Sequence, residues 1–285
     1  MKILVTGAGG LVGGSTIKFC REIGDTVIAA ARRRLDIADK ESVLSFLQAE
    51  KPDSVINCAA FTDVDGCETD REKNFSANAD GVKNLALGCR RINANLVTIS
   101  TDYVFDGAKT DFYTQRDDPN PQSEYGKAKL LGEQMAKNNL ARAIVVRTGW
   151  IFGANGKNFL SNMPQLLLAG KKIKVIRDSY GTPTYAPDLA RRLRELAELD
   201  LPGIYHVTNA GEGTTYEGFA RFIAGVDQNL IEDVSFADLR RPAPRPQNSK
   251  LRCLISEKLG LKPLQHWQRA LEEFAGSRAK QKKDE

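Results

Sequence analysis

The sequence lacks paired cysteines, clustered histidines and long apolar runs, and each absence argues against a class of protein. Its five cysteines are scattered over 285 residues without a Cys-x-x-Cys pair, which argues against a disulfide framework or a zinc site and favours free thiols in a reducing cytoplasm. No apolar run is long enough to span a bilayer, and residues 1–5 lead directly into a strand-like run. We therefore expect no membrane association, no signal peptide and no bound metal.

The sequence also lacks a large excess of positive or negative charge. The net charge is +5, much of it from residues 32–34, residues 171–172 and the C-terminal end. No basic stripe contains interleaved aromatic residues, so we expect no nucleic-acid partner. The mild positive balance suits a small anionic ligand instead. The two histidines, His206 and His266, are isolated in the sequence, and we expect both to be structural.

What the sequence does contain is an alternation of short apolar runs with helical patterns. Strands that alternate with helices build βαβ units, so the pattern predicts an α/β fold with a Rossmann-like doubly wound parallel sheet. The apolar runs have no polar face, as in buried parallel strands, and they occupy residues 3–6, 26–30, 54–58, 96–100 and 143–147.

The alternation breaks after residue 147, which indicates a smaller lobe and two crossings of the chain between lobes. The predicted units are a dinucleotide-binding domain of residues 1–150 with about 175–208, a smaller C-terminal α/β substrate-binding lobe of residues 151–174 with 209–276, and a flexible tail of residues 277–285.

A glycine-rich loop, Thr6-Gly-Ala-Gly-Gly-Leu-Val-Gly13, follows the first predicted strand and opens the first predicted helix. Its glycines would provide a tight turn, close approach of the backbone to a ligand and close packing of the helix. The helix N-terminus would then face a pyrophosphate. In this context the spacing predicts a dinucleotide site that includes Gly7, Gly9, Gly10, Leu11, Val12 and Gly13.

Basic residues, rather than an acidic one, follow the second predicted strand. NAD-preferring sites usually place Asp or Glu there to hold the ribose 2′-hydroxyl, whereas guanidinium groups suit a 2′-phosphate. Arg32 and Arg33 therefore favour NADPH, with NADH as the other option. Asp36 could contact adenine or ribose instead, and Ile37 lies beside it in the predicted site. A solvated basic turn is the plain structural alternative.

Tyr125 precedes Lys129 by four residues in a predicted helix, which places both side chains on one helix face. An ammonium about 4 Å from a phenol would contribute roughly 4 kcal/mol at an effective dielectric of ~20, or ~3 pH units, which is the shift that an acid–base tyrosine needs near neutral pH. The pair alone is frequent on surface helices. The glycine loop, and Thr101 just after the strand over 96–100, make catalysis the favoured interpretation.

Together these pieces resemble the extended short-chain dehydrogenase/reductase family and, within it, the dTDP-4-dehydrorhamnose reductases. The likeness runs from residue 1 to about residue 274. The narrower motifs that carry it are Ser100-Thr-Asp-Tyr-Val-Phe105, Tyr125-Gly-Lys-Ala-Lys-Leu-Leu-Gly-Glu133, Arg147-Thr-Gly-Trp150 and Arg245-Pro-Gln-Asn-Ser-Lys-Leu251.

The resemblance implies a cytoplasmic reductase that transfers a hydride from NADPH to C4 of a nucleotide-linked 4-keto-6-deoxy sugar. Within the family the implied reaction converts dTDP-4-dehydro-β-L-rhamnose to dTDP-L-rhamnose. Tyr125 would protonate the forming alkoxide and Thr101 would donate a hydrogen bond to the carbonyl oxygen. Lys129 would hold the nicotinamide ribose and lower the pKa of the tyrosine.

Further ligand-binding residues follow from the same resemblance. After the third strand, the cofactor would be lined by Ala59, Ala60, Phe61 and Thr62. The sugar would be contacted by Thr101, Asp102, Tyr125 and Trp150, and its diphosphate by Arg245 and Asn248. Core packing of Trp150 and a proline-rich surface turn around Arg245 are the structural alternatives.

Three other interpretations stay open. A non-catalytic NADP-binding regulatory subunit, similar to that of methionine adenosyltransferase, shares the fold and the Tyr/Lys pair but lacks tryptophan at the position of Trp150. An epimerase or dehydratase is disfavoured, because a dehydratase usually has an Asp-Glu pair after the threonine and this chain has Asp102-Tyr103. A reductase of another 4-keto-deoxy sugar nucleotide would carry the same motifs. A homodimer is possible in every case.

Overall fold

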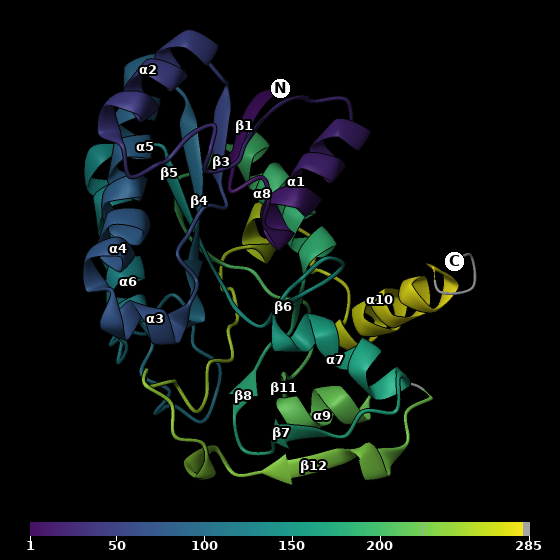
Figure 1. Ribbon diagram of the computed structural model, residues 1–285. Helices are drawn as coiled ribbons and strands as arrows, with labels where there is room; N and C mark the ends of the chain where they lie inside the picture. The colour runs from purple at the N-terminus through teal and green to yellow at the C-terminus, as the bar shows by residue number, and fades with distance from the viewer. Residues whose placement is uncertain (224, 282–285) are drawn as a thin grey trace.

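A six-stranded sheet forms the centre of the computed structural model, which describes residues 1–223 and 225–281 (Figure 1). Every neighbouring pair of strands is parallel, in the order β10-β5-β4-β3-β1-β2. Asn57 at the end of β3 pairs with Thr98 of β4, and β4 continues to Thr101. The strands are β1 (Lys2–Thr6), β2 (Thr26–Ala30), β3 (Ser54–Asn57), β4 (Asn95–Thr101), β5 (Ala143–Thr148) and β10 (Gly203–His206).

Helices cover both faces of this sheet, as Figure 1 shows. One face is covered by α1 (Leu11–Glu22) and α8 (Ala186–Leu199), which pack against each other. The other is covered by α2 (Lys40–Glu50), α5 (Gly81–Ile92) and α6 (Glu124–Asn139). The predicted doubly wound α/β fold is therefore confirmed.

Successive residues of the sheet strands supply two apolar cores. Leu4 and Val55 lie in the core beneath α2, α5 and α6, while Ile3, Val5 and Ile56 lie in the core beneath α1 and α8. All five side chains are inaccessible to solvent. Because side chains alternate between the faces of a strand, a strand covered on both sides must be apolar at consecutive positions.

Short polar side chains begin the helices near the carboxyl ends of β3 and β4. Asp63 and Asp70 cap α3 (Val64–Thr69) and α4 (Arg71–Phe75), and Ser123 caps α6. Each side chain accepts a hydrogen bond from a backbone N–H of the first helical turn, which typically stabilises a helix by about 1 kcal/mol. These caps determine where the helices that surround the cavity described below begin.

A smaller lobe packs around its own apolar core, which includes Phe152, Phe219 and Trp267. β7 pairs with β12 and β6 with β9 in parallel, and β8 pairs with β11 in antiparallel. The lobe contains β6 (Ile151–Phe152), α7 (Phe159–Leu168), β7 (Ile173–Ile176), β8 (Tyr180–Gly181), β9 (Thr184–Tyr185), β11 (Thr214–Thr215), α9 (Tyr216–Arg221), β12 (Ile231–Val234) and α10 (Trp267–Gln281). A π-helical turn occupies Ser76–Asp80, and 3₁₀ turns occupy Asp102–Val104, Gln228–Leu230, Phe236–Asp238 and Glu257–Leu259.

The lobes divide the chain differently from the prediction in two places. The chain rejoins the large sheet at α8 rather than near residue 175, because β7 and β8 pair with β12 and β11 inside the smaller lobe. Leu264, predicted in the smaller lobe, packs in the core beneath α1 and α8. The predicted tail, 277–285, begins within α10, which continues to Gln281, and residues 282–285 lie outside the described residues.

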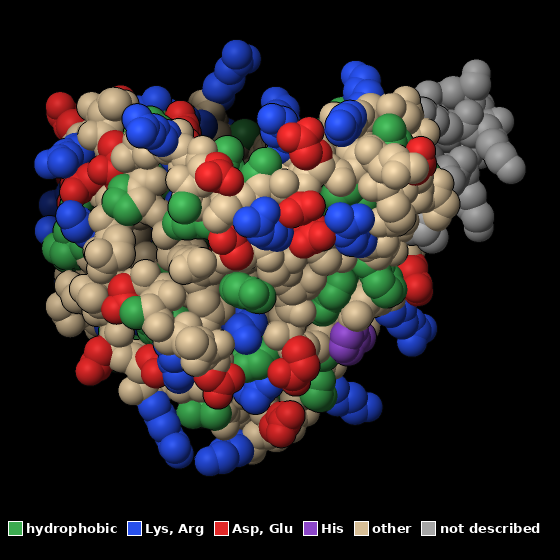
Figure 2. Space-filling model, turned by 90° about the horizontal axis from the view of Figure 1, so that it is seen from below, with side chains coloured by type: hydrophobic (Ala, Val, Ile, Leu, Met, Phe, Trp, Pro, Cys, Tyr) green, Lys and Arg blue, Asp and Glu red, His purple; other side chains and the backbone are tan. Residues whose placement is uncertain are grey.

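Charges of both signs alternate over the end of the molecule drawn in Figure 2. In the smaller lobe, for example, Lys172, just before β7, and Lys174, on β7, lie 3.7 and 3.4 Å from the carboxylate of Glu232 on β12. A search of the described residues finds no helix that is both long and apolar enough to cross a membrane.

Candidate active site

A cavity of about 700 Å³ opens at the carboxyl ends of the parallel strands. It lies where the strand order reverses between β1 and β3, which is where ligands bind in open α/β sheets. Residues of α7 and α9 close it on the side of the smaller lobe. Most predicted site residues line it, namely Gly7, Gly9, Gly10, Leu11, Val12, Gly13, Arg32, Asp36, Ile37, Ala59, Ala60, Phe61, Thr62, Thr101, Asp102, Tyr125, Lys129 and Trp150.

The glycine loop is shaped as a cradle that side chains would fill. Gly7 has φ = +66°, a left-handed conformation that glycine adopts without strain. A Cβ at Gly7 would lie 2.6 Å from the carbonyl carbon of Cys58, and a Cβ at Gly13 would lie 2.2 Å from the carbonyl oxygen of Gly7. The first turn of α1 contains no acidic residue, so its N–H groups and positive dipole end are free to bind an anion. The loop fits the pyrophosphate of a dinucleotide.

We expect Gly13→Ala to weaken binding of the dinucleotide cofactor at least tenfold, because the added methyl group would overlap the Gly7 carbonyl oxygen and displace the loop. Gly14→Ala is the matched control. A Cβ at Gly14 meets nothing closer than the Ala8 carbonyl oxygen at 4.0 Å, and alanine is the better helix former. Fluorescence titration with NADPH compares the two variants, and equal affinities would contradict the cradle.

Tyr125, Lys129 and Thr101 meet at the carboxyl end of β4. Thr101 is the last residue of β4, and its hydroxyl accepts a hydrogen bond from the backbone N–H of Tyr103 at 3.2 Å. The buried ammonium of Lys129 donates to the Ile99 carbonyl oxygen at 2.7 Å. The ring of Tyr125 lies edge-on to that of Tyr103, with centroids 6.0 Å apart. Strand β4 and helix α6 thus hold a phenol, an ammonium and a hydroxyl at one end of the cavity.

The expectation that Lys129 lowers the pKa of Tyr125 is wrong. Burial raises the pKa of Tyr125 above its usual value and the charge of Asp102 raises it further, while the Thr101 hydroxyl opposes the shift. The i,i+4 spacing does place both residues on one face, but the ammonium reaches a β4 carbonyl instead of the phenol. Burial also lowers the pKa of Lys129 to about 8, against the attraction of Glu133. Tyr125 is consequently protonated at neutral pH, the form that a proton donor requires.

Asp102 places a buried carboxylate on the cavity wall. Oδ1 accepts a hydrogen bond from the Thr101 hydroxyl at 3.0 Å, whereas Oδ2 has no hydrogen-bond partner among the described residues. Burial raises the pKa of Asp102 to about 6, and the hydroxyls of Ser249 and Thr101 oppose that shift. Gly149 leaves room for the carboxyl group, since a Cβ there would lie 2.3 Å from Cγ of Asp102. Oδ2 is also inaccessible to solvent, so a ligand hydroxyl can bond to it only when the carboxyl group turns toward the cavity.

Trp150 and Tyr216 form the wall on the side of the smaller lobe. Their rings stack with centroids 4.1 Å apart, and both line the cavity. Trp150 has φ = +50°, an uncommon conformation for a bulky residue that surrounding contacts must maintain. Gly181 of β8 supplies one such contact, because a Cβ there would lie 2.0 Å from Cε2 of the indole. Trp150 therefore lines the cavity and also packs against the apolar core of the smaller lobe.

At the opposite end of the cavity, Arg32 and Asp36 follow β2. Nε of Arg32 donates to Oδ2 of Asp36 at 3.0 Å, and both side chains are exposed. An exposed pair of this kind contributes at most about 1 kcal/mol, so the guanidinium can turn to an anionic ligand at little cost. The structure thus brings one of the two predicted 2′-phosphate arginines to the cavity.

Arg33 and Arg245, which were predicted to bind phosphate groups, do not line the cavity. Arg33 is exposed in the turn after β2. Arg245 donates from both terminal nitrogens to the carboxylate of Asp65 on α3, each at 2.9 Å. Its charge still acts on the cavity phenols of Tyr103 and Tyr216. Binding a diphosphate would require Arg245 to leave Asp65.

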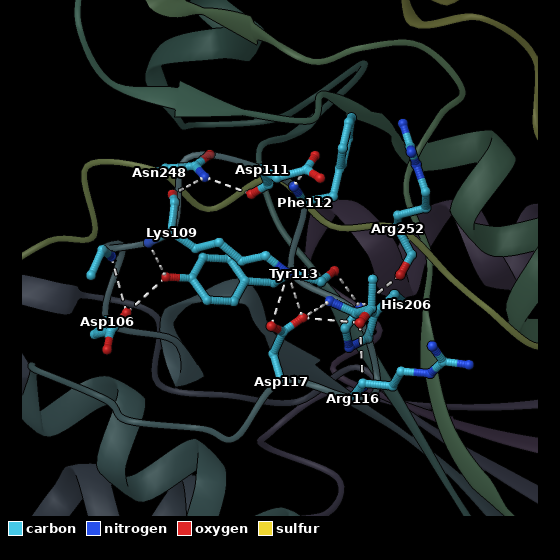
Figure 3. Close-up of polar contacts among 12 residues, drawn as sticks. Asp106, Lys109, Asp111, Phe112, Tyr113, Arg116, Asp117, His206, Asn248 and Arg252 are labelled. Carbon is cyan, nitrogen blue, oxygen red and sulfur yellow. Dashed lines mark hydrogen bonds and ion pairs between the residues drawn. The ribbon is translucent and has the colours of Figure 1, made fainter.

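Asn248, the other predicted diphosphate ligand, is used to hold a loop (Figure 3). Its amide nitrogen donates to the carbonyl oxygens of Lys109 and Asp111, at 2.5 and 2.8 Å. The same loop contains Tyr113, whose hydroxyl donates to Asp106 at 2.7 Å. With both amide hydrogens engaged, Asn248 has no donor left for a phosphate, and its predicted role is corrected to a structural one.

Sequence reasoning missed several cavity residues. Lys73 lies in a charged stretch, and Tyr216 in the smaller lobe, so no local spacing marks either residue as part of the site. Within residues 1–223 and 225–281, no group of His, Cys, Asp and Glu could hold a metal ion. The further lining residues are Ala31, Leu35, Cys58, Val64, Lys73, Ala77, Ile99, Ser100, Tyr103, Thr148, Gly149, Ile151, Asn158, Phe159, Leu160 and Tyr216.

Comparison with known proteins matches residues 1–279 to the family described as RmlD substrate binding domain. The chain is 38% identical to the spore coat polysaccharide biosynthesis protein SpsK of Bacillus subtilis, covering 98% of each protein. It is 37% identical to dTDP-4-dehydrorhamnose reductase of Mycobacterium tuberculosis, covering 95% of this chain and 91% of that enzyme. The dTDP-4-dehydrorhamnose reductase of Bacillus anthracis, solved in complex with NADP, matches with a TM-score of 0.91 at 32% identity, covering 96% of this chain and 98% of that one.

Proposed function

Since this chain belongs to the RmlD substrate binding domain family, we propose that it is an NADPH-dependent reductase that converts dTDP-4-dehydro-β-L-rhamnose to dTDP-L-rhamnose. The family makes it an NAD(P)-dependent reductase of nucleotide-linked 4-keto sugars, and the proposal adds the sugar and the cofactor preference. The observation that carries it is the meeting of Tyr125, Thr101 and Asp102 in the cavity that begins at the glycine loop.

Different residues of the cavity would bind the cofactor, donate the proton and stabilise the developing charge in a carbonyl reduction. When bound, the nicotinamide cofactor supplies the hydride to C4 of the sugar. The glycine loop would hold its pyrophosphate, and Lys129, with two N–H donors beyond the one given to β4, would hold ribose hydroxyls. The protonated phenol of Tyr125 gives its proton to the developing alkoxide, and Thr101 donates a hydrogen bond to the same oxygen.

The sugar would lie between Asp102 and the stacked pair of Trp150 and Tyr216. Asp102 lines the cavity and can accept from a ring hydroxyl once its buried Oδ2 turns toward the ligand, while the aromatic pair offers a flat apolar wall. A lining tryptophan also favours a catalytic role over that of a regulatory subunit. All five cysteines are free thiols, which fits the reducing cytoplasm that we propose as the compartment.

We expect Arg32→Ala to lower the preference for NADPH over NADH by about tenfold, measured as the ratio of kcat/KM for the two cofactors. A hydrogen bond from a guanidinium to a charged acceptor contributes about 1.5–3 kcal/mol, and only NADPH has a 2′-phosphate to receive it. Arg33→Ala is the matched control, since Arg33 does not line the cavity. An unchanged ratio in Arg32→Ala would argue against this assignment.

The identity of the sugar is tested by product analysis over a panel of nucleotide-linked 4-keto-6-deoxy sugars. The proposal predicts the highest kcat/KM for dTDP-4-dehydro-β-L-rhamnose. The chain is as similar to SpsK as to the dTDP-4-dehydrorhamnose reductase. The name of SpsK mentions a polysaccharide and specifies no sugar. Preference for another sugar of the panel would keep the reductase and replace its substrate.

A further inference from the structure

Few cations line a cavity that must bind a doubly charged pyrophosphate. The N-terminus of α1 supplies the equivalent of about half a positive charge. The lining side chains that carry a full positive charge are Arg32, Lys73 and Lys129. Arg32 lies at the end of β2, paired with Asp36, and the ammonium of Lys129 is bonded to a β4 carbonyl. Lys73 is therefore left without an assigned ligand.

Lys73 is held over an aromatic ring rather than by a carboxylate. Its Nζ lies 4.3 Å from the centroid of the Phe61 ring. Arg71, on the same helix α4, lies 3.6 Å from the carboxylate of Glu124, whereas Lys73 has no carboxylate within ion-pair distance in the described part of the chain. A cation over a ring face keeps its charge available to an anion, and the ring restricts where it can lie.

The ring beneath Lys73 is fixed next to the glycine loop. The backbone N–H of Phe61 donates to Oδ1 of Asn78 at 3.1 Å, and Nδ2 of Asn78 donates to the Phe61 carbonyl at 2.9 Å. Two residues earlier, the backbone nitrogen of Ala59 would lie 2.7 Å from a Cβ at Gly7. The segment that carries Phe61 is thus packed directly on the loop that fits the pyrophosphate.

We infer that Lys73 is a further cofactor-binding residue, which binds the pyrophosphate of the nicotinamide dinucleotide opposite the N-terminus of α1. The inference rests on the proposed function for the nature of the ligand. It names the cofactor rather than the substrate diphosphate, because Lys73 lies over Phe61, whose segment packs on the glycine loop, whereas Asp102, Trp150 and Tyr216 form the part of the wall proposed for the sugar.

Titration of the full-length protein with NADPH and with NADH, without any sugar nucleotide, tests this inference. We expect Lys73→Met to bind both cofactors about tenfold more weakly, with a smaller dependence on salt, because one charge-assisted contact is lost. Lys73→Arg should stay near wild type. Lys137→Met, on the exposed last turn of α6 and away from the cavity, is the control, and equal melting temperatures would exclude loss of fold.

Other outcomes overturn the inference. Weaker binding of NADPH alone would move Lys73 to the 2′-phosphate. Unchanged cofactor affinity with a raised KM for the sugar nucleotide would move it to the substrate diphosphate, and no effect at all would leave it outside the site. The titration contains no sugar, so a failure of the proposed substrate would appear only in turnover and would leave the binding result intact.

Discussion

Tyr125→Phe is expected to lower kcat by about 10³-fold while the affinity for NADPH stays within about twofold of wild type. The substitution removes only the phenolic hydroxyl, and loss of a positioned general acid typically costs 10²- to 10⁴-fold. The partly buried ring keeps its edge-on contact with Tyr103, so the cavity should keep its shape. Absorbance of the reduced cofactor at saturating sugar nucleotide measures kcat, and fluorescence titration measures the affinity.

Tyr103 provides the comparison inside the same cavity. Its side chain is partly buried and lines the cavity, burial raises its pKa above the usual value, and it lies beside Tyr125, yet it follows β4 instead of opening α6. We expect Tyr103→Phe to cost less than tenfold in kcat. The opposite pattern, with a large loss in Tyr103→Phe and little in Tyr125→Phe, would transfer the proton donor to Tyr103.

Arg147→Met is expected to lower the free energy of unfolding by about 3–5 kcal/mol. Arg147 of β5 and Glu133 of α6 form a two-pronged ion pair with N–O distances of 2.9 and 2.7 Å, and each residue is 3% exposed. The Ser100 hydroxyl also donates to Glu133, at 2.5 Å. Without the guanidinium, the carboxylate remains buried with its charge uncompensated. Urea unfolding followed by circular dichroism gives the difference.

Two variants isolate the cause of that loss. Arg147→Met combined with Glu133→Leu removes the orphaned charge and should recover most of the stability. Lys18→Met breaks a pair with Glu22 in which both side chains are exposed and 3.8 Å apart, and should cost at most about 0.5 kcal/mol. A loss below 1 kcal/mol in Arg147→Met would show that the buried pair is not coupled to folding.

The parts of this molecule that follow from local pattern were predictable. Consecutive apolar residues such as Leu4 and Val5 identify strands covered on both faces, and polar residues directly after such strands belong to the edge where ligands bind. Thr101 and the glycine loop, which the sequence predicts at this edge, both line the cavity.

Features that depend on contacts distant in sequence were not predictable. Asp65 lies 180 residues from Arg245, and nothing in either segment marks the pair that occupies the guanidinium. The pairing of β7 with β12, which moves the boundary of the lobe, is equally non-local. For Lys129 the spacing specified a helix face, whereas the direction of a long flexible side chain depends on the β4 carbonyl above it.

Transfer of deuterium from [4-²H]NADPH to the sugar tests the reaction most directly, with each cofactor C4 epimer tried against dTDP-4-dehydro-β-L-rhamnose. Wild-type protein should place deuterium at C4 of dTDP-L-rhamnose from one epimer only, at a rate that Tyr125→Phe reduces by about 10³-fold. Oxidation of the cofactor without deuterium in the sugar, or equal rates in the two proteins, would contradict a hydride transfer completed by the Tyr125 phenol.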